Sequence, residues 1–178
     1  MKDSHNQIGP SADRRDKPKR RWWAWARDIG LVLLVLLAVQ WWQARDLANA
    51  AAPPLAGILA DGEPYQLVSG EGPTLVHFWA EWCPICRLEQ GSIDRIATDH
   101  RVITVATTSG TADEVRAFLQ AEGLGFSTLM DEGGDVARTW GVSGVPATFI
   151  VDSTGMITSA TQGYSTEFGL RLRLWLAD

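Results

Sequence analysis

The two cysteines of the chain stand three residues apart, directly after an apolar run, and this arrangement constrains the fold more than any other feature. The run, residues 74–80 (TLVHFWA), is nearly continuously apolar, which predicts a strand buried on both faces of a sheet. A helix should follow from Cys83, because Pro84 is tolerated in a first turn and apolar residues recur after it at Ile85, Leu88, Ile93 and Ile96. A C-x-x-C pair between a strand and a helix predicts thiol redox chemistry.

The position of the pair assigns a role to each sulfur. The free N–H groups and the positive dipole end of a helix N-terminus favour a thiolate, so Cys83 should have a lowered pKa and attack first. Cys86, one turn further along and facing inward, would then resolve the mixed disulfide by attacking Cys83. Substrate oxidation would follow the same steps in reverse.

The rest of the chain alternates between predicted strands and helices. Asp61-Gly62 predicts a turn between two short strands, and residues 102–106 predict a further buried strand. Thr111 and Glu114 have capping-box spacing ahead of a helix that should stop at Gly123. A strand is predicted over residues 127–130 and a short helix over residues 135–140.

The C-terminal part predicts a hairpin and a last helix. The hairpin joins residues 147–151 to 156–161, and the helix begins at Ser165 with an apolar side made of Phe168, Leu172, Trp175 and Leu176. Together these elements predict an α/β fold whose central sheet is mostly parallel with an antiparallel edge.

Charge divides the chain into two parts. Residues 1–28 carry eight basic and four acidic residues, whereas the rest carries eight basic and seventeen acidic ones. Every lysine lies within the first nineteen residues, which argues against a nucleic-acid-binding body, since phosphate recognition needs basic groups on the folded part. Two cysteines are also too few for a four-thiolate zinc site.

An apolar segment with tryptophan-rich ends follows the basic tail. Residues 22–42 contain the uncharged run IGLVLLVLLAV between two tryptophan clusters, and at about 1.5 Å per residue a helix of this length matches a hydrocarbon core. The basic residues before it predict a cytoplasmic N-terminus, so the domain that follows the span should lie on the exported side of the membrane. We therefore expect a disordered tail (1–21), a transmembrane helix (22–42), a linker (43–54) and a domain (55–178). Cleavage after Ala50 and a twin-arginine signal at Arg20-Arg21 are the alternatives.

Two motifs carry a family resemblance. FWAEWCPIC and, about sixty residues later, GVPATF (144–149) resemble thioredoxin-fold proteins. The hairpin before the first core strand and the added helix and strand before residue 135 are similar to the membrane-tethered TlpA/ResA/DsbE branch. Within that branch, HFWAEWCPICRLEQ is most similar to the suppressor-of-copper-sensitivity D type of protein disulfide oxidoreductase. The resemblance covers residues 55–178.

The resemblance implies further site residues. It implies a cis Pro146 against the active-site disulfide and a Val145 backbone that pairs with the substrate. Trp82, Pro84 and Ile85 are the other expected substrate contacts. His77 stands where thioredoxin has a buried acid, so it is either a proton acceptor for Cys86 or a hydrogen-bonded core histidine.

The resemblance implies a thiol:disulfide oxidoreductase that is anchored by a single span in the inner (cytoplasmic) membrane, has a periplasmic catalytic domain and acts on exported thiol or disulfide proteins. It also implies a link to copper tolerance or cytochrome c maturation. Its electrons would come from a transmembrane donor of the DsbD/ScsB type, and no cofactor or metal site is expected. The alternatives are a Cu(I)-binding thiol protein or metallochaperone, since two thiolates suit that soft ion, and a merely structural disulfide. A covalent c-type haem is excluded, because Arg87 stands where the C-x-x-C-H motif needs a histidine.

Asp131, Glu132 and Asp135 form an acidic loop that either binds a cation weakly or is a solvated turn.

Overall fold

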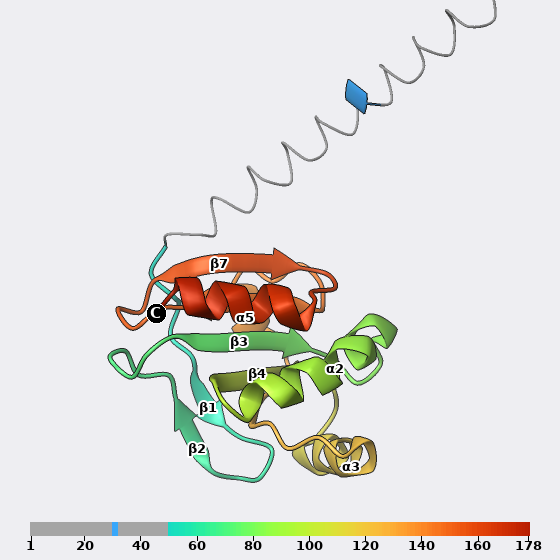
Figure 1. The fold of residues 1–178 in the computed structure, drawn as a ribbon. Coiled ribbons are helices and arrows are strands. Elements are labelled where there is room, and N and C mark those ends of the chain that lie inside the picture. Colours follow the sequence, from blue (N-terminus) through green and yellow to red (C-terminus); the bar gives the residue numbers. More distant parts are fainter. Residues whose placement is uncertain (1–29, 32–49) are drawn as a thin grey trace, which may run out of the picture. The chain divides into compact units, whose positions relative to one another are not determined.

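The structure is a computed structural model that describes residues 30–31 and 50–178. The helices and strands from residue 50 onward, labelled in Figure 1, are, in chain order, β1 (Ala56–Ile58), β2 (Pro64–Gln66), β3 (Thr74–Trp79), α2 (Pro84–Ala97), β4 (Arg101–Thr107), α3 (Ala112–Glu122), β5 (Thr128–Asp131), α4 (Asp135–Thr139), β6 (Ala147–Val151), β7 (Ile157–Gln162) and α5 (Glu167–Leu176).

A five-stranded mixed sheet with the order β5-β4-β3-β6-β7 forms the centre of the domain. The strands β3, β4 and β5 run parallel, while β6 and β7 are antiparallel to their neighbours. β1 and β2 pair separately as the hairpin expected around Asp61-Gly62. The predicted α/β architecture with an antiparallel edge is confirmed.

Local sequence signals explain where the helices begin and end. Thr111 and Glu114 form a complete capping box at the start of α3, and Gly123 ends that helix with a left-handed φ of 66°. Cys83 is the N-cap of α2, with Pro84 in the first turn. The redox motif therefore stands at the junction between the C-terminal end of β3 and the N-terminal end of α2.

Alternation along the strands divides the core into two layers. Leu75 and Trp79 of β3 pack on one face of the sheet with buried residues of α2, α3 and α5. Val76 and Phe78 point to the other face, where Trp140, after α4, packs against Phe78 with ring centroids 5.6 Å apart. β3 is the middle strand and is buried along its whole length, as its apolar run predicts.

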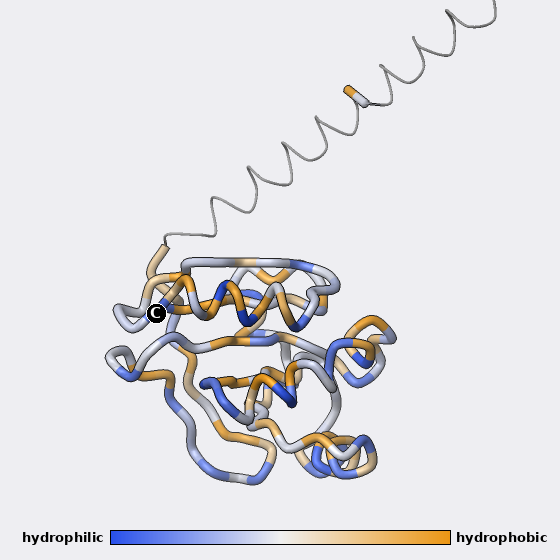
Figure 2. The backbone as a smooth tube through the Cα atoms, in the orientation of Figure 1, coloured by the Kyte–Doolittle hydropathy of each residue, from blue (hydrophilic) through white to orange (hydrophobic). Residues whose placement is uncertain are grey.

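Two helical faces differ from the prediction. In α2 the buried side is formed by Cys86, Glu89, Gln90, Ile93 and Ile96, whereas Ile85 and Leu88 are exposed. In α5 the helix starts at Glu167, with Thr166 as its N-cap. Its core residues are Leu170 and Leu174, and the side that the sequence identifies as apolar faces outward. Figure 2 shows hydrophobic residues on successive turns of α5.

The segment expected to cross the membrane, residues 22–42, lies outside the described residues apart from Gly30 and Leu31. Within the part of the chain that is described, no helix combines the length and the hydrophobicity needed to span a bilayer. The described residues of the predicted linker are hydrogen-bonded to the domain, because Ala52 N donates to Gly155 O (2.8 Å) and Ile157 N donates to Ala50 O (2.9 Å).

Candidate active site

Cys83 and Cys86 form a disulfide at the N-terminus of α2, with their Cα atoms 5.3 Å apart. Cys83 Sγ accepts a hydrogen bond from the backbone N–H of Cys86 (3.2 Å), so one free N–H of the helix points directly at this sulfur. The first turn holds no acidic residue that would oppose a negative charge there. A thiolate at Cys83 is therefore stabilised by both the helix dipole and a hydrogen bond.

The segment before β6 approaches the disulfide from the other side. The Val145–Pro146 peptide bond is cis, as the resemblance implies, and Val145 O lies 3.7 Å from Cys83 Sγ. Pro146 is buried and Val145 is half-buried. The sheet thus brings together a redox pair and a backbone carbonyl from positions about sixty residues apart in the chain.

The expected substrate contacts around the motif lie at the surface. Trp82 is 63% exposed and its indole N–H donates to Thr108 O (3.1 Å), which orients the ring beside the redox pair. Pro84 and Ile85 are also exposed, next to Cys83. Trp79, in contrast, is fully buried, where its indole N–H donates to Thr104 Oγ1 (3.1 Å). An apolar rim that could receive a polypeptide therefore surrounds a nearly buried disulfide.

His77 lies in the core beneath the motif, on the face of β3 that α2 covers. Its cross-strand neighbours are Thr104 and Thr148, and its Nδ1 is 2.9 Å from Thr148 Oγ1. Nε2 is buried without a hydrogen-bond partner among the described residues. Burial lowers the pKa of His77 from 6.5 to about 4, so the imidazole is neutral at pH 7.

Glu89 is a buried acid that the sequence analysis missed. It follows Cys86 by three residues on the buried side of α2, a spacing that places the two Cβ atoms about 5–6 Å apart. Oε1 accepts a hydrogen bond from Ser165 N (2.5 Å), and Oε2 is buried without a partner among the described residues. Burial raises the pKa of Glu89 from 4.5 to about 7, against the opposing effect of the Ser165 N–H.

The acidic loop is a solvated turn at Glu132 and Asp135, which are exposed, but its first residue, Asp131, differs from that expectation. Asp131 is buried and accepts hydrogen bonds from the Val136 and Ala137 N–H groups (3.0 Å each) and from Thr107 Oγ1 (2.6 Å). It therefore satisfies the free N–H groups at the start of α4. No group of three or more metal-ligating side chains occurs in the described part of the chain.

The two buried groups should give the free energy of unfolding opposite dependences on pH. Glu89 binds its proton more tightly in the folded state, so its contribution is complete below pH 4.5 and is lost as the pH rises to about 7. His77 binds its proton less tightly in the folded state, so its contribution is complete above pH 6.5 and is lost as the pH falls to about 4. Each pKa shift corresponds to about 3 kcal/mol of free energy of unfolding, so the two pH dependences nearly cancel in the native chain where their pH ranges overlap.

Single substitutions should reveal the two effects separately. In His77→Asn, the free energy of unfolding should fall as the pH rises from 4.5 to 7, whereas in Glu89→Gln it should rise between pH 4 and 6.5. Urea unfolding of the oxidised protein at half-unit pH steps measures both slopes. Slopes of the same sign in the two variants would contradict the assigned protonation states.

Comparisons with known proteins are consistent with this geometry. The model of the AhpC/TSA family matches residues 48–160. A thioredoxin-like protein of Haemophilus influenzae is 33% identical over 107 residues, covering 60% of this chain and 64% of its own length, so the match spans less than two thirds of that relative. The thiol:disulfide interchange protein HelX of Rhodobacter capsulatus is 33% identical over 131 residues, covering 67% of this chain and 74% of HelX.

A solved structure shares the fold. The exposed lipoprotein thioredoxin of Streptococcus pneumoniae superposes with a TM-score of 0.61 at 23% identity, covering 70% of this chain and 99% of the pneumococcal one. At that identity the match shows a common thioredoxin-like fold, which confirms the fold predicted from the two motifs.

Proposed function

Because the chain belongs to the AhpC/TSA family, we propose that it is a thiol:disulfide oxidoreductase of the TlpA, ResA and DsbE branch. The observation that carries this proposal is the Cys83–Cys86 disulfide at a helix N-terminus, with the carbonyl of Val145 beside Cys83 Sγ. The substrate class is an exported polypeptide that contains a disulfide or a pair of thiols.

Reduction of a substrate begins at the N-cap. The Cys83 thiolate attacks one sulfur of the substrate disulfide, a mixed disulfide forms, and the other substrate sulfur leaves as a thiolate. The thiol of Cys86 then loses its proton and attacks Cys83 Sγ. The Cys83–Cys86 disulfide forms, the second substrate sulfur leaves, and two electrons have passed to the substrate. Oxidation of a dithiol is the same sequence in reverse.

Glu89 is the proton acceptor for Cys86 in this mechanism. Both side chains are fully buried on one side of α2, and the pKa of about 7 lets the carboxylate accept a proton at neutral pH and release it again. His77 is the less suitable acceptor, because its lowered pKa makes the imidazole a weak base and its Nδ1 is already engaged by Thr148. It acts as a core histidine.

Substrate binding uses the rim of the disulfide. An extended segment of the substrate pairs with the Val145 backbone next to Pro146, and its side chains lie against Trp82, Pro84 and Ile85. The exposed indole and the apolar Ile85 are suited to unfolded or loosely folded polypeptides, which present apolar side chains. The protein thus recognises its substrate mainly through the Val145 backbone and the apolar side chains around the disulfide.

The membrane anchor and the compartment are part of the proposal. The apolar run within residues 22–42, its tryptophan-rich ends and the basic residues before it support a single transmembrane helix with a cytoplasmic N-terminus. The domain is then periplasmic, where a transmembrane donor of the DsbD/ScsB type keeps it reduced. The sequence around His77 and the cysteines supports a suppressor-of-copper-sensitivity D type, with copper tolerance or cytochrome c maturation as the process served.

A redox titration of the full-length protein tests the proposed activity. The protein should catalyse the reduction of insulin by dithiothreitol, and its disulfide should equilibrate with a thiol buffer at a defined potential, read from the emission of Trp79 and Trp82. A value near the roughly −270 mV of thioredoxin indicates a reductant, and one near the roughly −120 mV of DsbA indicates an oxidant. Stoichiometric Cu(I) capture without any turnover of disulfides would instead favour the copper-binding alternative.

A further inference from the structure

Helix α5 is apolar on two opposite sides. At about 100° per residue, Leu170 and Leu174 point inward, and the opposite side carries four large apolar residues with no charge among them. Their exposed fractions are 77% for Phe168, 43% for Leu172, 71% for Trp175 and 69% for Leu176. We call these four side chains the outer stripe. A helix that covers an ordinary protein surface presents polar residues on this side, so the outer stripe lacks a partner among the described residues.

The C-terminal end of the outer stripe lies at the end of the sheet where β3 and β4 start, which is the end farthest from the cysteines. Arg171 donates to Asp99 (2.7 Å), which follows α2 and precedes the first residue of β4. Arg101, the first residue of β4, pairs with Thr74, the first residue of β3. Cys83 follows the last residue of β3, so Asp99 and Cys83 lie at opposite ends of this strand. Trp175 lies one turn beyond Arg171, further toward the end at which β3 starts.

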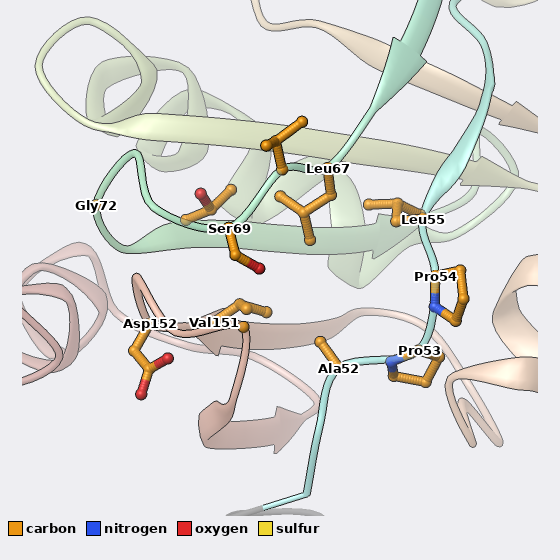
Figure 3. A pocket seen from close by; sticks show the side chains of 12 residues that line it. Ala52, Pro53, Pro54, Leu55, Leu67, Ser69, Gly72, Val151 and Asp152 are labelled. Atoms are coloured by element: carbon orange, nitrogen blue, oxygen red, sulfur yellow. The ribbon is translucent and has the colours of Figure 1, made fainter.

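The first described residues of the domain, Ala50 and Ala51, lie at the same end of the sheet. Ile157 N donates to Ala50 O (2.9 Å), and Ala51 pairs with Met156. These contacts flank the turn after Val151, which pairs with Thr74. Figure 3 shows that Ala52, Pro53, Pro54 and Leu55 line one pocket together with Val151 and Asp152. In Figure 1 the C-terminus lies at the same end of the domain as the first coloured part of the trace after the grey segment.

A short connection separates this end of the sheet from the predicted membrane span. Only residues 43–49 lie between the span and Ala50, and seven residues reach at most about 25 Å. If residues 22–42 cross the bilayer, the end of the sheet that carries Trp175 and Leu176 is held within about 25 Å of the lipid surface. The cysteines lie about 20 Å from that end of the sheet along β3.

We propose that the outer stripe of α5 lies in the interfacial layer of the bilayer to which the chain is tethered. The inference rests on the membrane anchor of the proposed function. Phenylalanine and leucine enter the boundary of the acyl chains, while an indole keeps its ring in the apolar zone and its N–H in the wet one. Arg173 lies on one flank of the outer stripe, where its guanidinium would meet lipid phosphates. Arg171, on the other flank, is paired with Asp99 and Glu167 within the domain.

This contact fixes the orientation of the redox centre. A tether alone lets the domain rotate, whereas a second contact through α5 keeps the opposite end, with Cys83, Trp82 and Val145, directed toward the exported space. Substrates and a membrane-embedded donor would then meet the disulfide at a constant height above the lipid.

The test uses the full chain reconstituted in vesicles of phosphatidylethanolamine and phosphatidylglycerol, with or without brominated acyl chains. Trp175→Phe removes one exposed indole of the outer stripe, and Trp82→Phe removes an indole of similar exposure at the other end of the domain. The emission assigned to each residue is the difference between wild type and variant, measured in the dithiol form. Bromolipid should quench the Trp175 difference and leave the Trp82 difference unchanged.

Two controls separate this inference from the proposed function. Flotation with the vesicles tests the anchor, and insulin reduction tests the redox activity. If the chain floats and reduces insulin but the Trp175 emission is the same in both kinds of vesicle, the contact between α5 and lipid is overturned and the proposed function stands. Dimers that cross-link through α5, together with unquenched Trp175, would overturn it in favour of a second copy. Failure to float would overturn the anchor itself.

Discussion

Serine in place of Cys83 should abolish disulfide exchange, leaving insulin reduction at the uncatalysed background. Cys83 Sγ is the sulfur that receives the helix N–H, so the first attack depends on it. Cys86 has no exposed surface and cannot replace it as the attacking sulfur. The measurement is insulin turbidity with dithiothreitol, at equal concentrations of wild type and variant.

Serine in place of Cys86 should have a different outcome and serves as the matched control. The first attack by Cys83 remains, but the mixed disulfide is not resolved, so the substrate stays covalently bound. Non-reducing electrophoresis of Cys86→Ser expressed in cells should show adducts that thiol reagents release, and mass spectrometry would identify the substrates. Adducts formed by Cys83→Ser, or turnover that survives in it, would reverse the assigned order of attack.

The local structure around Cys83 and Cys86 is largely predictable from the sequence, because its signals are local. The strand before Cys83, the helix after it and the capping box of Thr111 and Glu114 each depend on neighbours within a few residues. The cis Pro146 came from the resemblance. Its approach to Cys83 is a long-range contact, set by the pairing of β6 with β3, which no local pattern contains.

The buried sides of α5 and α2 differ from the prediction because hydrophobic periodicity alone does not fix which side of a helix meets the sheet. Hydrophobic periodicity identifies an apolar side of a helix but does not say which of two apolar sides meets the sheet. In α5 the buried side is formed by Leu170 and Leu174. Thr166 caps the helix and the Ser165 N–H donates to Glu89 of α2, and these contacts fix how the start of α5 lies against α2. In α2, Ile93 and Ile96 are buried as predicted, but the buried side is rotated toward Cys86, Glu89 and Gln90, which leaves Ile85 and Leu88 outside.

Glu89 was missed for a related reason, although a signal was present. A helix whose buried side runs through Cys86, Gln90 and Ile93 places the residue at 89 inside as well, so a charged residue there breaks the polarity pattern. Acidic residues are almost never fully buried without a partner of opposite charge, and Glu89, whose only partner among the described residues is the Ser165 N–H, is such an exception beside a redox cysteine. Asp131 is the opposite case, because its buried carboxylate is satisfied by α4 and by Thr107.

Glutamine in place of Glu89 should slow the resolution of the mixed disulfide by about 10²-fold at pH 7, the usual loss when a general base is removed. The amide keeps the acceptor for Ser165 N but cannot take the proton of Cys86. In wild type the rate of resolution should rise with pH through about 7, where Glu89 ionises. In the variant it should rise only near the pKa of an ordinary thiol, about 8.5.

Rapid mixing of the reduced protein with a chromogenic disulfide separates the two steps, because release of the first leaving group reports attack by Cys83 and release of the second reports resolution by Cys86. His77→Asn is the matched control, since it also changes a buried polar group under the motif but leaves the proposed acceptor in place. It should keep the wild-type pH profile. A variant of Glu89 with an unchanged profile, or a His77 variant whose second step loses its dependence near pH 7, would transfer the role of acceptor from the carboxylate to the imidazole.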